Sequence, residues 1–451
     1  MENSFVETLC RGGLTTLRIK AIILLVCLLI FGFAAPHSDL WAGDPYSAFY
    51  SPDNDRIFWF IHISDSHIGR SGTQDSENLE WIVNEARTVI NPAFIVNTGD
   101  LTDSTNGGPI PDGPYSDEWV EYNTILSKAG MNPTFYYDIP GNHDHYNDRY
   151  FAWYLADSMQ GPATGQTQIS WRKAFLFGNY HFIGTCTAGN DGAPFSLLPP
   201  NFGDNAGLDE DELTYIQTEL EGNRDADLTI IFGHHPVLPT GEPGETSLTY
   251  GAEEFISLME EFGVSMYAFG HTHRYDESFL PGDSSDGIFY LNAGALSESS
   301  EKQYTVTAID CNGISTVAMD VETWPVVLIT APVDRNLGAD DNPYAYSIDD
   351  LNPKPIRALV FDANQVLQVR FRIDSMGDWH PMTEVPGNPY LWEASLDDTS
   401  LLSQEDHTLE VQATGSSTRS DIIVIGRHRS NGPSGESGGG GGGCFINATR
   451  H

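Results

Sequence analysis

Short apolar runs that end in polar residues recur along residues 56–322. Each run has the length and composition of a buried strand, and they lie at residues 57–64, 94–99, 134–140, 180–185, 228–235, 265–273 and 288–294. Between several of them lie amphipathic stretches that predict helices, at residues 76–90, 117–129, 209–221 and 252–262. Alternating strands and helices favour an α/β core of stacked layers, which binds its ligands at the carboxyl ends of the strands.

The pattern changes at residues 322–332, after which strands follow one another without helices. These strands are expected at residues 356–362, 366–374, 390–396, 407–414 and 421–426, with turns rich in Gly, Pro, Asn and Asp between them. Such a series predicts an all-β sandwich, Ig-like in architecture only, because the Cys-Trp-Cys spacing of antibody domains is missing. We therefore expect an α/β domain at 50–322, a β-sandwich at 325–427, a Gly/Ser-rich linker at 428–443 and a short tail at 444–451.

Residues 1–42 have the pattern of a targeting segment. Arg11, Arg18 and Lys20 precede the apolar run at 21–35, which has the length of a signal-peptide core. The segment predicts either a signal peptide or an uncleaved N-terminal anchor, and so a protein that is periplasmic, displayed on the cell surface or secreted. No later stretch of the sequence is long and apolar enough for a membrane span, so none is expected after signal removal.

Charge limits the partners of the chain. Its 451 residues include 63 acidic and 22 basic side chains, a formal net charge of −41. Such a charge repels nucleic acids, so we expect no nucleic-acid partner. A site for an anionic substrate must then carry local positive charge, and metal ions are the obvious source.

The cysteines allow two alternatives. Removal of a signal peptide on export would leave Cys186, Cys311 and Cys444, which allows either one Cys186–Cys311 disulfide or two buried free thiols.

Five polar segments follow apolar runs and carry the candidate chemistry. They are Asp65-Ser66-His67, residues 99–103 (GDLTD), residues 141–144 (GNHD), residues 233–236 (GHHP) and residues 270–273 (GHTH). Each one alone could also be a turn, a helix cap or a surface loop, although two histidines at i and i+2 in residues 270–273 favour a metal more strongly than the other segments do. Together they combine carboxylate, amide and imidazole ligands, a mixture that suits Zn, Fe or Mn. The set predicts a site for two metal ions.

In order and residue type, these five segments resemble the calcineurin-like metallophosphoesterase family, over about residues 57–300. The resemblance implies a four-layer α/β/β/α sandwich and two divalent or trivalent ions, Mn, Fe or Zn, that share one aspartate. Asp65, His67 and His273 would bind the first ion, and Asn142, His234 and His271 the second. Asp100 would bridge the two ions.

The same resemblance implies a phosphoric ester hydrolase acting on a small phosphomonoester or phosphodiester. A hydroxide held between the two ions would attack phosphorus in line. Asn142, as a neutral ligand, would leave the second ion electron-poor. His143 would stabilise the developing oxyanion or protonate the leaving alkoxide, and Asp144 would orient the His143 imidazole.

Other residues near the segments have less defined roles. Asp103 is expected either to support the site as Asp144 does or to cap a helix. His235 is expected either to face away or to donate a supporting hydrogen bond. His145 and Arg274 are candidate substrate contacts. Residues 183–189 (IGTCTAG) depart from the Leu-Asp-Thr-like segment of many family members, so the substrate of those relatives cannot be transferred to this chain.

Two further resemblances concern the C-terminal half. Residues 322–332 and the strands after them resemble the junction in a eukaryotic transmembrane metallophosphoesterase family, in which an Ig-like domain follows the catalytic domain. The glycine run before Cys444-Phe445-Ile446 resembles a bacterial sorting-type tail.

The alternative to an enzyme is a non-catalytic, metal-containing binding or adhesion protein that acts through the β-sandwich on an unidentified partner. The pair His143-Asp144 favours the enzyme, because a binding scaffold has no need of a general acid.

Overall fold

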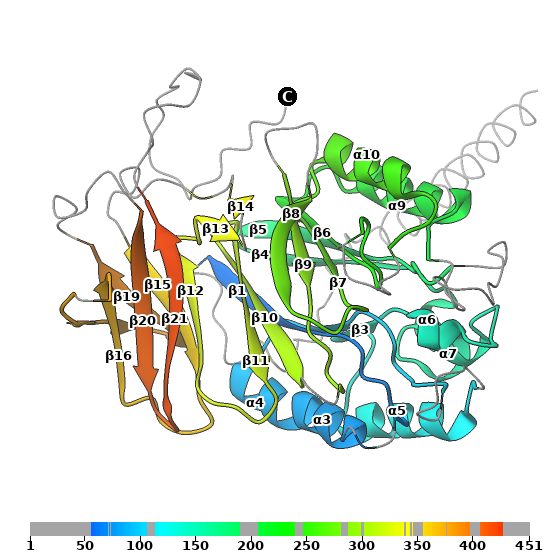
Figure 1. Ribbon diagram of the computed structural model, residues 1–451, viewed down its shortest axis with the longest axis horizontal. Helices are drawn as coiled ribbons and strands as arrows, with labels where there is room; N and C mark the ends of the chain where they lie inside the picture. The colour runs from blue at the N-terminus through cyan, green and yellow to red at the C-terminus, as the bar shows by residue number, and fades with distance from the viewer. Residues whose placement is uncertain are drawn as a thin grey trace, which may run out of the picture. The chain divides into compact units, whose positions relative to one another are not determined.

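Figure 1 shows the structure, a computed structural model. It describes residues 56–70, 72, 74–105, 113–189, 206–239, 247–280, 287–298, 302–337, 340–342, 345, 355–375, 377–396 and 406–426. The expected targeting segment at 1–42, the linker at 428–443 and the tail at 444–451 lie outside these residues.

The first sheet has five strands in the order β11-β10-β1-β2-β3. Strands β1, β2 and β3 run parallel; β10 pairs antiparallel with β1, and β11 pairs antiparallel with β10 at one edge. The bounds are β1 Ile57–Ile63, β2 Ile95–Asn97, β3 Tyr136–Asp138, β10 Gln303–Asp310 and β11 Gly313–Asp320. On its outer face lie α3 (Asp75–Trp81), the π-helix η2 (Ile82–Ala86), α4 (Arg87–Ile90) and α5 (Ser116–Lys128) (Figure 1).

The second sheet has six strands in the order β4-β5-β6-β7-β9-β8. Strands β5, β6, β7 and β9 run parallel, and the edge strands β4 and β8 are antiparallel. The bounds are β4 Ile169–Phe175, β5 Gly178–Gly184, β6 Leu228–Phe232, β7 Met266–Phe269, β8 Asp276–Leu280 and β9 Ile288–Asn292. Helices α9 (Glu210–Gly222) and α10 (Ala252–Phe262) cover its outer face (Figure 1).

Strand alternation divides the apolar side chains between two cores. In β6, Ile230 and Phe232 face the first sheet and pack in one core with Phe58, Phe60 and Phe94. Ile231, between them, points the other way and packs with helices α9 and α10. Successive side chains of a strand point to opposite faces, so a sheet covered on both faces is apolar at every position. The expected α/β/β/α layer order is thereby confirmed.

The expected elements are present, with shorter bounds and several additions. Helix α9 begins where the acidic residues predicted, since the Asp209 carboxylate accepts from the Asp211 and Glu212 amides at 2.9 and 3.2 Å. Strands β4, β8, β10 and β11, which pair antiparallel with their neighbours, were not expected. Three short helices were also not expected, namely α6 (Asn142–His145), α7 (Ala152–Asp157) and α8 (Gly161–Thr164). Their sequences are short and mixed in polarity, so they carry no clear period.

The C-terminal region is all-β, as expected. Two antiparallel sheets, in the orders β12-β15-β19-β18 and β17-β16-β20-β21, pack face to face over a core that includes Ile329, Val360, Phe371 and Val411. This β-sandwich is compatible with the expected Ig-like architecture. The bounds are β12 Val326–Ala331, β15 Pro355–Phe361, β16 Gln368–Ile373, β17 His380–Pro381, β18 Thr383–Val385, β19 Asn388–Ser395, β20 His407–Thr414 and β21 Thr418–Ile425; a small pair, β13 Asn336–Leu337 and β14 Asp340–Asp341, lies beside it.

The outer face of β1 contacts the β-sandwich directly. The Trp59 ring lies 5.4 Å from the Phe361 ring and 5.5 Å from the Tyr390 ring, between centroids. Nearby, the Arg357 guanidinium of β15 lies 3.3 Å from the buried Asp310 carboxylate at the end of β10. Thr330 Oγ1 of β12 also donates to Asp310, at 2.7 Å. The two regions therefore share an aromatic contact and a buried ion pair.

Two smaller expectations are settled by the described residues. Cys186 and Cys311 are free thiols, so the alternative of a disulfide between them is wrong. Among the described residues, no helix combines the length and apolar character needed to cross a membrane.

The Asp310–Arg357 pair generates a test of stability. In Arg357→Met, we expect the free energy of unfolding to fall by about 3 kcal/mol, because the Asp310 carboxylate stays buried without its cation. Burial already raises the pKa of Asp310, and Arg357 opposes that rise. Without Arg357 the folded-state pKa rises further, so the stability loss should be larger at pH 8 than at pH 5, where Asp310 takes up a proton.

Chemical denaturation at both pH values checks this prediction. The matched control is Arg172→Met, since Arg172 pairs with Asp225 at 3.0 Å but both side chains are well exposed. Exposed pairs contribute at most about 1 kcal/mol. Equal losses in the two variants would contradict the buried-pair argument.

Candidate metal centre

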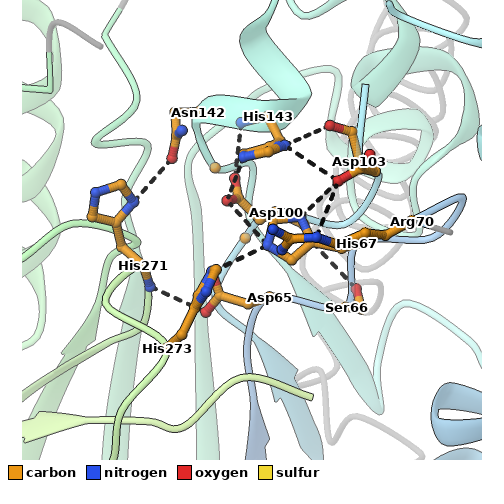
Figure 2. A network of polar contacts seen from close by, with 12 residues as sticks. Asp65, Ser66, His67, Arg70, Asp100, Asp103, Asn142, His143, His271 and His273 are labelled. Atoms are coloured by element: carbon orange, nitrogen blue, oxygen red, sulfur yellow. Dashed lines mark hydrogen bonds and ion pairs between the residues drawn. The ribbon is translucent and has the colours of Figure 1, made fainter. Parts of the chain in front are cut away.

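Five strand ends from two sheets meet at one place (Figure 2). In the first sheet, β1 leads to Asp65 and His67, β2 to Asp100 and β3 to Asn142. In the second sheet, β6 leads to His234 and β7 to His271 and His273. Parallel strands place their carboxyl ends at the same edge of a sheet, and the two stacked sheets bring both edges together. All seven predicted ligand residues converge here.

The Asp100 carboxylate lies between two groups of ligating side chains. Its Oδ1 is 3.3 Å from His234 Nε2, and its Oδ2 is 3.8 Å from His67 Nε2. Asp65, Asp100 and His234 have ligating atoms within 4.8 Å of one another, so the two groups form one continuous cluster. The geometry of Asp100 is that of a carboxylate able to contact two ions at once.

The first group consists of Asp65, His67 and His273. Their ligating atoms lie within 4.8 Å of one another, and Asp65 and His67 are fully buried. His273 Nε2 is 3.3 Å from Asp65 Oδ1 and 3.2 Å from His67 Nε2. Three atoms that can each donate a lone pair therefore face a common point.

The second group consists of Asn142, His234 and His271. Asn142 Oδ1 lies 3.0 Å from His234 Nε2 and 3.1 Å from His271 Nδ1. The other ring nitrogen of His234, Nδ1, lies 2.9 Å from the Thr98 carbonyl oxygen, which can only accept. His234 Nδ1 therefore carries a proton, and Nε2 is left to present its lone pair to the cluster.

The donor set fits bound cations. In each group, lone pairs of oxygen and nitrogen converge at 3.0–3.3 Å, an arrangement that is repulsive unless a proton or a metal ion lies among them. In the protein without metal, the imidazoles of the cluster bind protons instead. Burial alone would lower the imidazole pKa values, but the neighbouring Asp100 raises the pKa of His234 to about 9, and Asp65 raises that of His273 to about 10. Mixed imidazole and carboxylate ligands suit Mn, Fe or Zn.

The backbone is held in an unusual conformation at the site. Five of the predicted ligand residues have a positive φ, which L-residues rarely adopt, namely Asp65, His67, Asp100, His271 and His273. Gly99, at φ 108°, precedes Asp100, and a Cβ there would lie 2.8 Å from His234 Nδ1. Strained residues persist where the surrounding structure holds them, and they concentrate at functional sites.

His143 points to the cluster, but Asp144 does not orient it. His143 Nε2 is 3.8 Å from Asp100 Oδ2, and its Nδ1 is hydrogen-bonded to the Asp103 carbonyl oxygen. Asp144 instead accepts from the backbone amides of Gly141, Leu101 and Thr102. The expected pairing of Asp144 with the imidazole is therefore corrected: a carboxylate in the first turn of α6 is close to the backbone amides of the adjacent loop, and these amides bind it.

Asp144 thus links two of the ligand loops. It connects the segment after Asp100 to the segment that carries Asn142, and Leu101 and Thr102 each donate to it at 3.0 Å. Burial, together with the nearby Asp100 carboxylate, raises the pKa of Asp144 to about 7. Its role in this geometry is to position the loops.

The remaining predicted residues have distinct surroundings. Asp103 faces both His67 Nδ1 and His143 Nδ1, at 3.7 and 3.9 Å, which agrees with a supporting role and not with a helix cap. His235 does not face away, because its ring lies 4.4 Å from the His271 ring. The His145 ring packs 4.9 Å from the Phe151 ring, and Arg274 is exposed directly after His273.

Two positioning residues were missed in the sequence. Thr187 Oγ1 accepts from the backbone amides of His234 and His235 and lies 3.0 Å from His235 Nδ1. Glu298 Oε2 lies 3.0 Å from His273 Nδ1. Thr187 belongs to residues 183–189, the segment that departs from its relatives, which is the one signal that drew attention to it. Glu298 follows β9 by six residues and has no motif around it.

Comparison with known proteins shows which family this chain is similar to. The sequence model of the calcineurin-like phosphoesterase family matches residues 58–275. Transmembrane protein 62 of Mus musculus is 27% identical over 409 residues, which is 86% of this chain and 58% of the mouse protein. An Arabidopsis thaliana protein that is named as a metallophosphoesterase is 25% identical over 378 residues, which is 70% of this chain and 48% of the Arabidopsis protein.

The chain thus spans about half the length of the curated relatives it matches. Among solved structures, a dimetal phosphatase from Danio rerio aligns with a TM-score of 0.46 and 14% identity, over 59% of this chain and 99% of that protein. The matched segment contains Asp65, Asp100, Asn142, His234 and His273. Residues 58–275 of this chain therefore belong to a calcineurin-like phosphoesterase domain.

Proposed function

We propose that this chain is a metal-dependent phosphoesterase that hydrolyses phosphomonoesters or phosphodiesters. The observation that supports this most directly is the position of the Asp100 carboxylate, whose two oxygens face His234 and His67 in different ligand groups. Asp65, His67 and His273 would hold one ion, Asn142, His234 and His271 the other, and Asp100 would contact both. Mn, Fe or Zn would fit these ligands.

The proposed ions would offset the electrostatic repulsion between an anionic substrate and a negatively charged protein. A phosphoester is anionic, and the chain carries a formal net charge of −41. Two bound cations would supply positive charge to hold the phosphoryl group and Lewis acidity to generate a nucleophile from water at neutral pH. The side chains of the site would set where these charges lie.

His143 is the proposed acid. Because its Nδ1 is bonded to the Asp103 carbonyl, which can only accept, Nδ1 carries a proton. Nε2 is then the atom that can hold and release a proton on the side of Asp100, 3.8 Å away. A proton on Nε2 would stabilise the charge developing on the phosphoryl oxygens or pass to the leaving oxygen of the ester.

The bounds and the location of the protein are proposals as well. We take the catalytic domain as residues 50–322 and the β-sandwich as 325–427, because β11 ends at Asp320 and β12 begins at Val326.

Export through residues 1–42 is supported by the basic residues that precede the apolar run. An N-terminal anchor is the alternative, and it gains support from a mouse relative that is named a transmembrane protein.

A panel of small phosphoesters tests the proposed activity. Metal-analysed protein with added Mn²⁺ should hydrolyse p-nitrophenyl phosphate or bis-p-nitrophenyl phosphate, and a chelator should abolish the reaction. If protein that holds both ions turns over no member of the panel, the alternative of a non-catalytic binding or adhesion protein is favoured.

The proposed bridging role of Asp100 predicts the effect of removing its charge. In Asp100→Asn, we expect at most one tightly bound ion per chain, because a neutral amide cannot serve two cations. Metal analysis after gel filtration measures the number bound. Asp225→Asn, which neutralises an exposed carboxylate far from the site, should keep the wild-type number, and two ions in Asp100→Asn would contradict the bridge.

The role of His143 predicts a kinetic effect without metal loss. His143→Asn should lower kcat by about 10²–10⁴-fold, the usual contribution of a positioned proton donor. The bound metal should stay the same, because His143 is not among the proposed ligands. The control is His380→Asn, on an exposed strand of the β-sandwich, which should retain full activity. An unchanged kcat in His143→Asn would remove this residue from the mechanism.

A further inference from the structure

A chain of charged groups runs behind the first ligand group and involves Glu298, Arg70 and Asp103. Glu298 Oε2 is 3.0 Å from His273 Nδ1, on the side of the ring opposite the cluster. The same oxygen is 3.2 Å from Arg70 Nη1, and Arg70 Nε is 3.8 Å from Asp103 Oδ1. Asp103 Oδ1 in turn lies 3.7 Å from His67 Nδ1 (Figure 2).

Both histidines of the first group are therefore backed by a carboxylate. His273 and His67 bring their Nε2 atoms to 3.2 Å from each other, and each Nδ1 faces a carboxylate oxygen. A carboxylate accepts a hydrogen bond and cannot donate one, so Glu298, at 3.0 Å, keeps the proton on His273 Nδ1 and leaves the Nε2 lone pair for a metal. Asp103, at 3.7 Å from His67 Nδ1, is beyond hydrogen-bond distance and acts on His67 through its charge. Arg70, between Glu298 and Asp103, joins the two supports.

The fold holds Glu298 in this place through the backbone before it. The Leu296 amide donates to the Ser64 carbonyl at 2.9 Å, and the Ser297 amide donates to the Asp65 carbonyl at 3.2 Å. The Leu296 carbonyl accepts from Asn78 Nδ2 at 3.0 Å. The segment is thus fixed alongside the end of β1, and Glu298 extends from it towards His273 with a side chain that is 19% exposed.

Arg70 is held by its own position in the turn after His67. Its amide donates to the His67 carbonyl at 3.0 Å and to Asp75 Oδ2 at 3.1 Å. The guanidinium therefore starts from the same loop as one proposed ligand and reaches the carboxylate that backs another. A rigid, planar guanidinium can hold two carboxylates in fixed directions, which a lysine does less well.

We propose that Glu298 is a positioning residue that fixes the tautomer and orientation of His273 for the first metal ion, and that Arg70 holds Glu298 and Asp103 in register. This inference rests on the proposed function, because it assumes that His273 and His67 bind a metal. It assigns Glu298 and Arg70 no contact with substrate.

Metal titration of the metal-free protein tests the proposal without using activity. The wild type should bind two Mn²⁺ ions. In Glu298→Ala, one of the two binding steps should weaken by about 10–100-fold, the usual cost of losing the partner of a metal-binding histidine. The other step should stay within about twofold. Glu298→Gln keeps an acceptor for Nδ1–H and should lose less than Glu298→Ala, and it is the variant to compare if the alanine variant does not fold.

Arg70→Met separates positioning from simple electrostatics. Removing a cation near a metal site would by charge alone strengthen metal binding. If Arg70 positions Glu298, the same binding step should weaken instead. Tighter binding in Arg70→Met would overturn the assignment of Arg70. The control Asp225→Asn removes a carboxylate from an exposed arginine pair and should bind both ions as the wild type does.

A spectroscopic signal reports the hydrogen bond itself. In the Co²⁺-loaded protein, the Nδ1–H proton of a ligating histidine gives a strongly shifted NMR signal that persists only if exchange with water is slow. The His273 signal should be visible in the wild type and lost in Glu298→Ala. If the wild type binds two ions and Glu298→Ala binds them equally well with this signal intact, the role of Glu298 is wrong; if the wild type binds none, the proposed metal site itself fails.

Discussion

The mutual repulsion of lone pairs around Asp100 is the constraint on which the rest of this structure depends. Carboxylate, amide and imidazole atoms converge at 3.0–3.8 Å in a buried place. Such a cluster is stable only with positive charge inside it, whether protons or metal ions. The raised pKa values of His234 and His273, to about 9 and 10, express the same demand in the protein without metal. The site is built to bind cations.

Packing of the two sheets against each other holds these groups close together. The aromatic core between the sheets includes Phe60, Phe94 and Phe232, with the Phe60 and Phe94 rings stacked 4.6 Å apart. Close packing of this core leaves the strand ends little freedom, so the residues after them can be kept at positive φ. Backbone strain at Asp65, Asp100 and His273 is thereby tolerated where ligands must point inward.

Supporting contacts divide into two sets, one behind each ligand group. Behind the second group, Thr187 accepts from the His234 amide and the Thr98 carbonyl binds His234 Nδ1. Behind the first, Glu298 and Asp103 face the Nδ1 atoms of His273 and His67. The second ligand group is therefore supported by a threonine hydroxyl and backbone groups, and the first ligand group by charged side chains. The first ion would therefore be the more sensitive of the two to substitutions outside its ligands.

The sequence by itself predicted a layered α/β core, the all-β region and the polar segments at strand ends, and its resemblance to the phosphoesterase family implied the layer order and the seven ligand candidates. Strand periods and the polar residues at strand ends are local features, so they can be recognised without coordinates. Only the tertiary structure decided the supporting contacts. Asp144 stands next to His143 in sequence but binds the Leu101 and Thr102 amides. Glu298 lies 25 positions after His273 with no motif around it, and it reaches that imidazole only because the preceding backbone is hydrogen-bonded alongside Ser64 and Asp65. Hydrogen bonds form between groups that the packed sheets bring together, and neighbouring positions in the chain do not specify them.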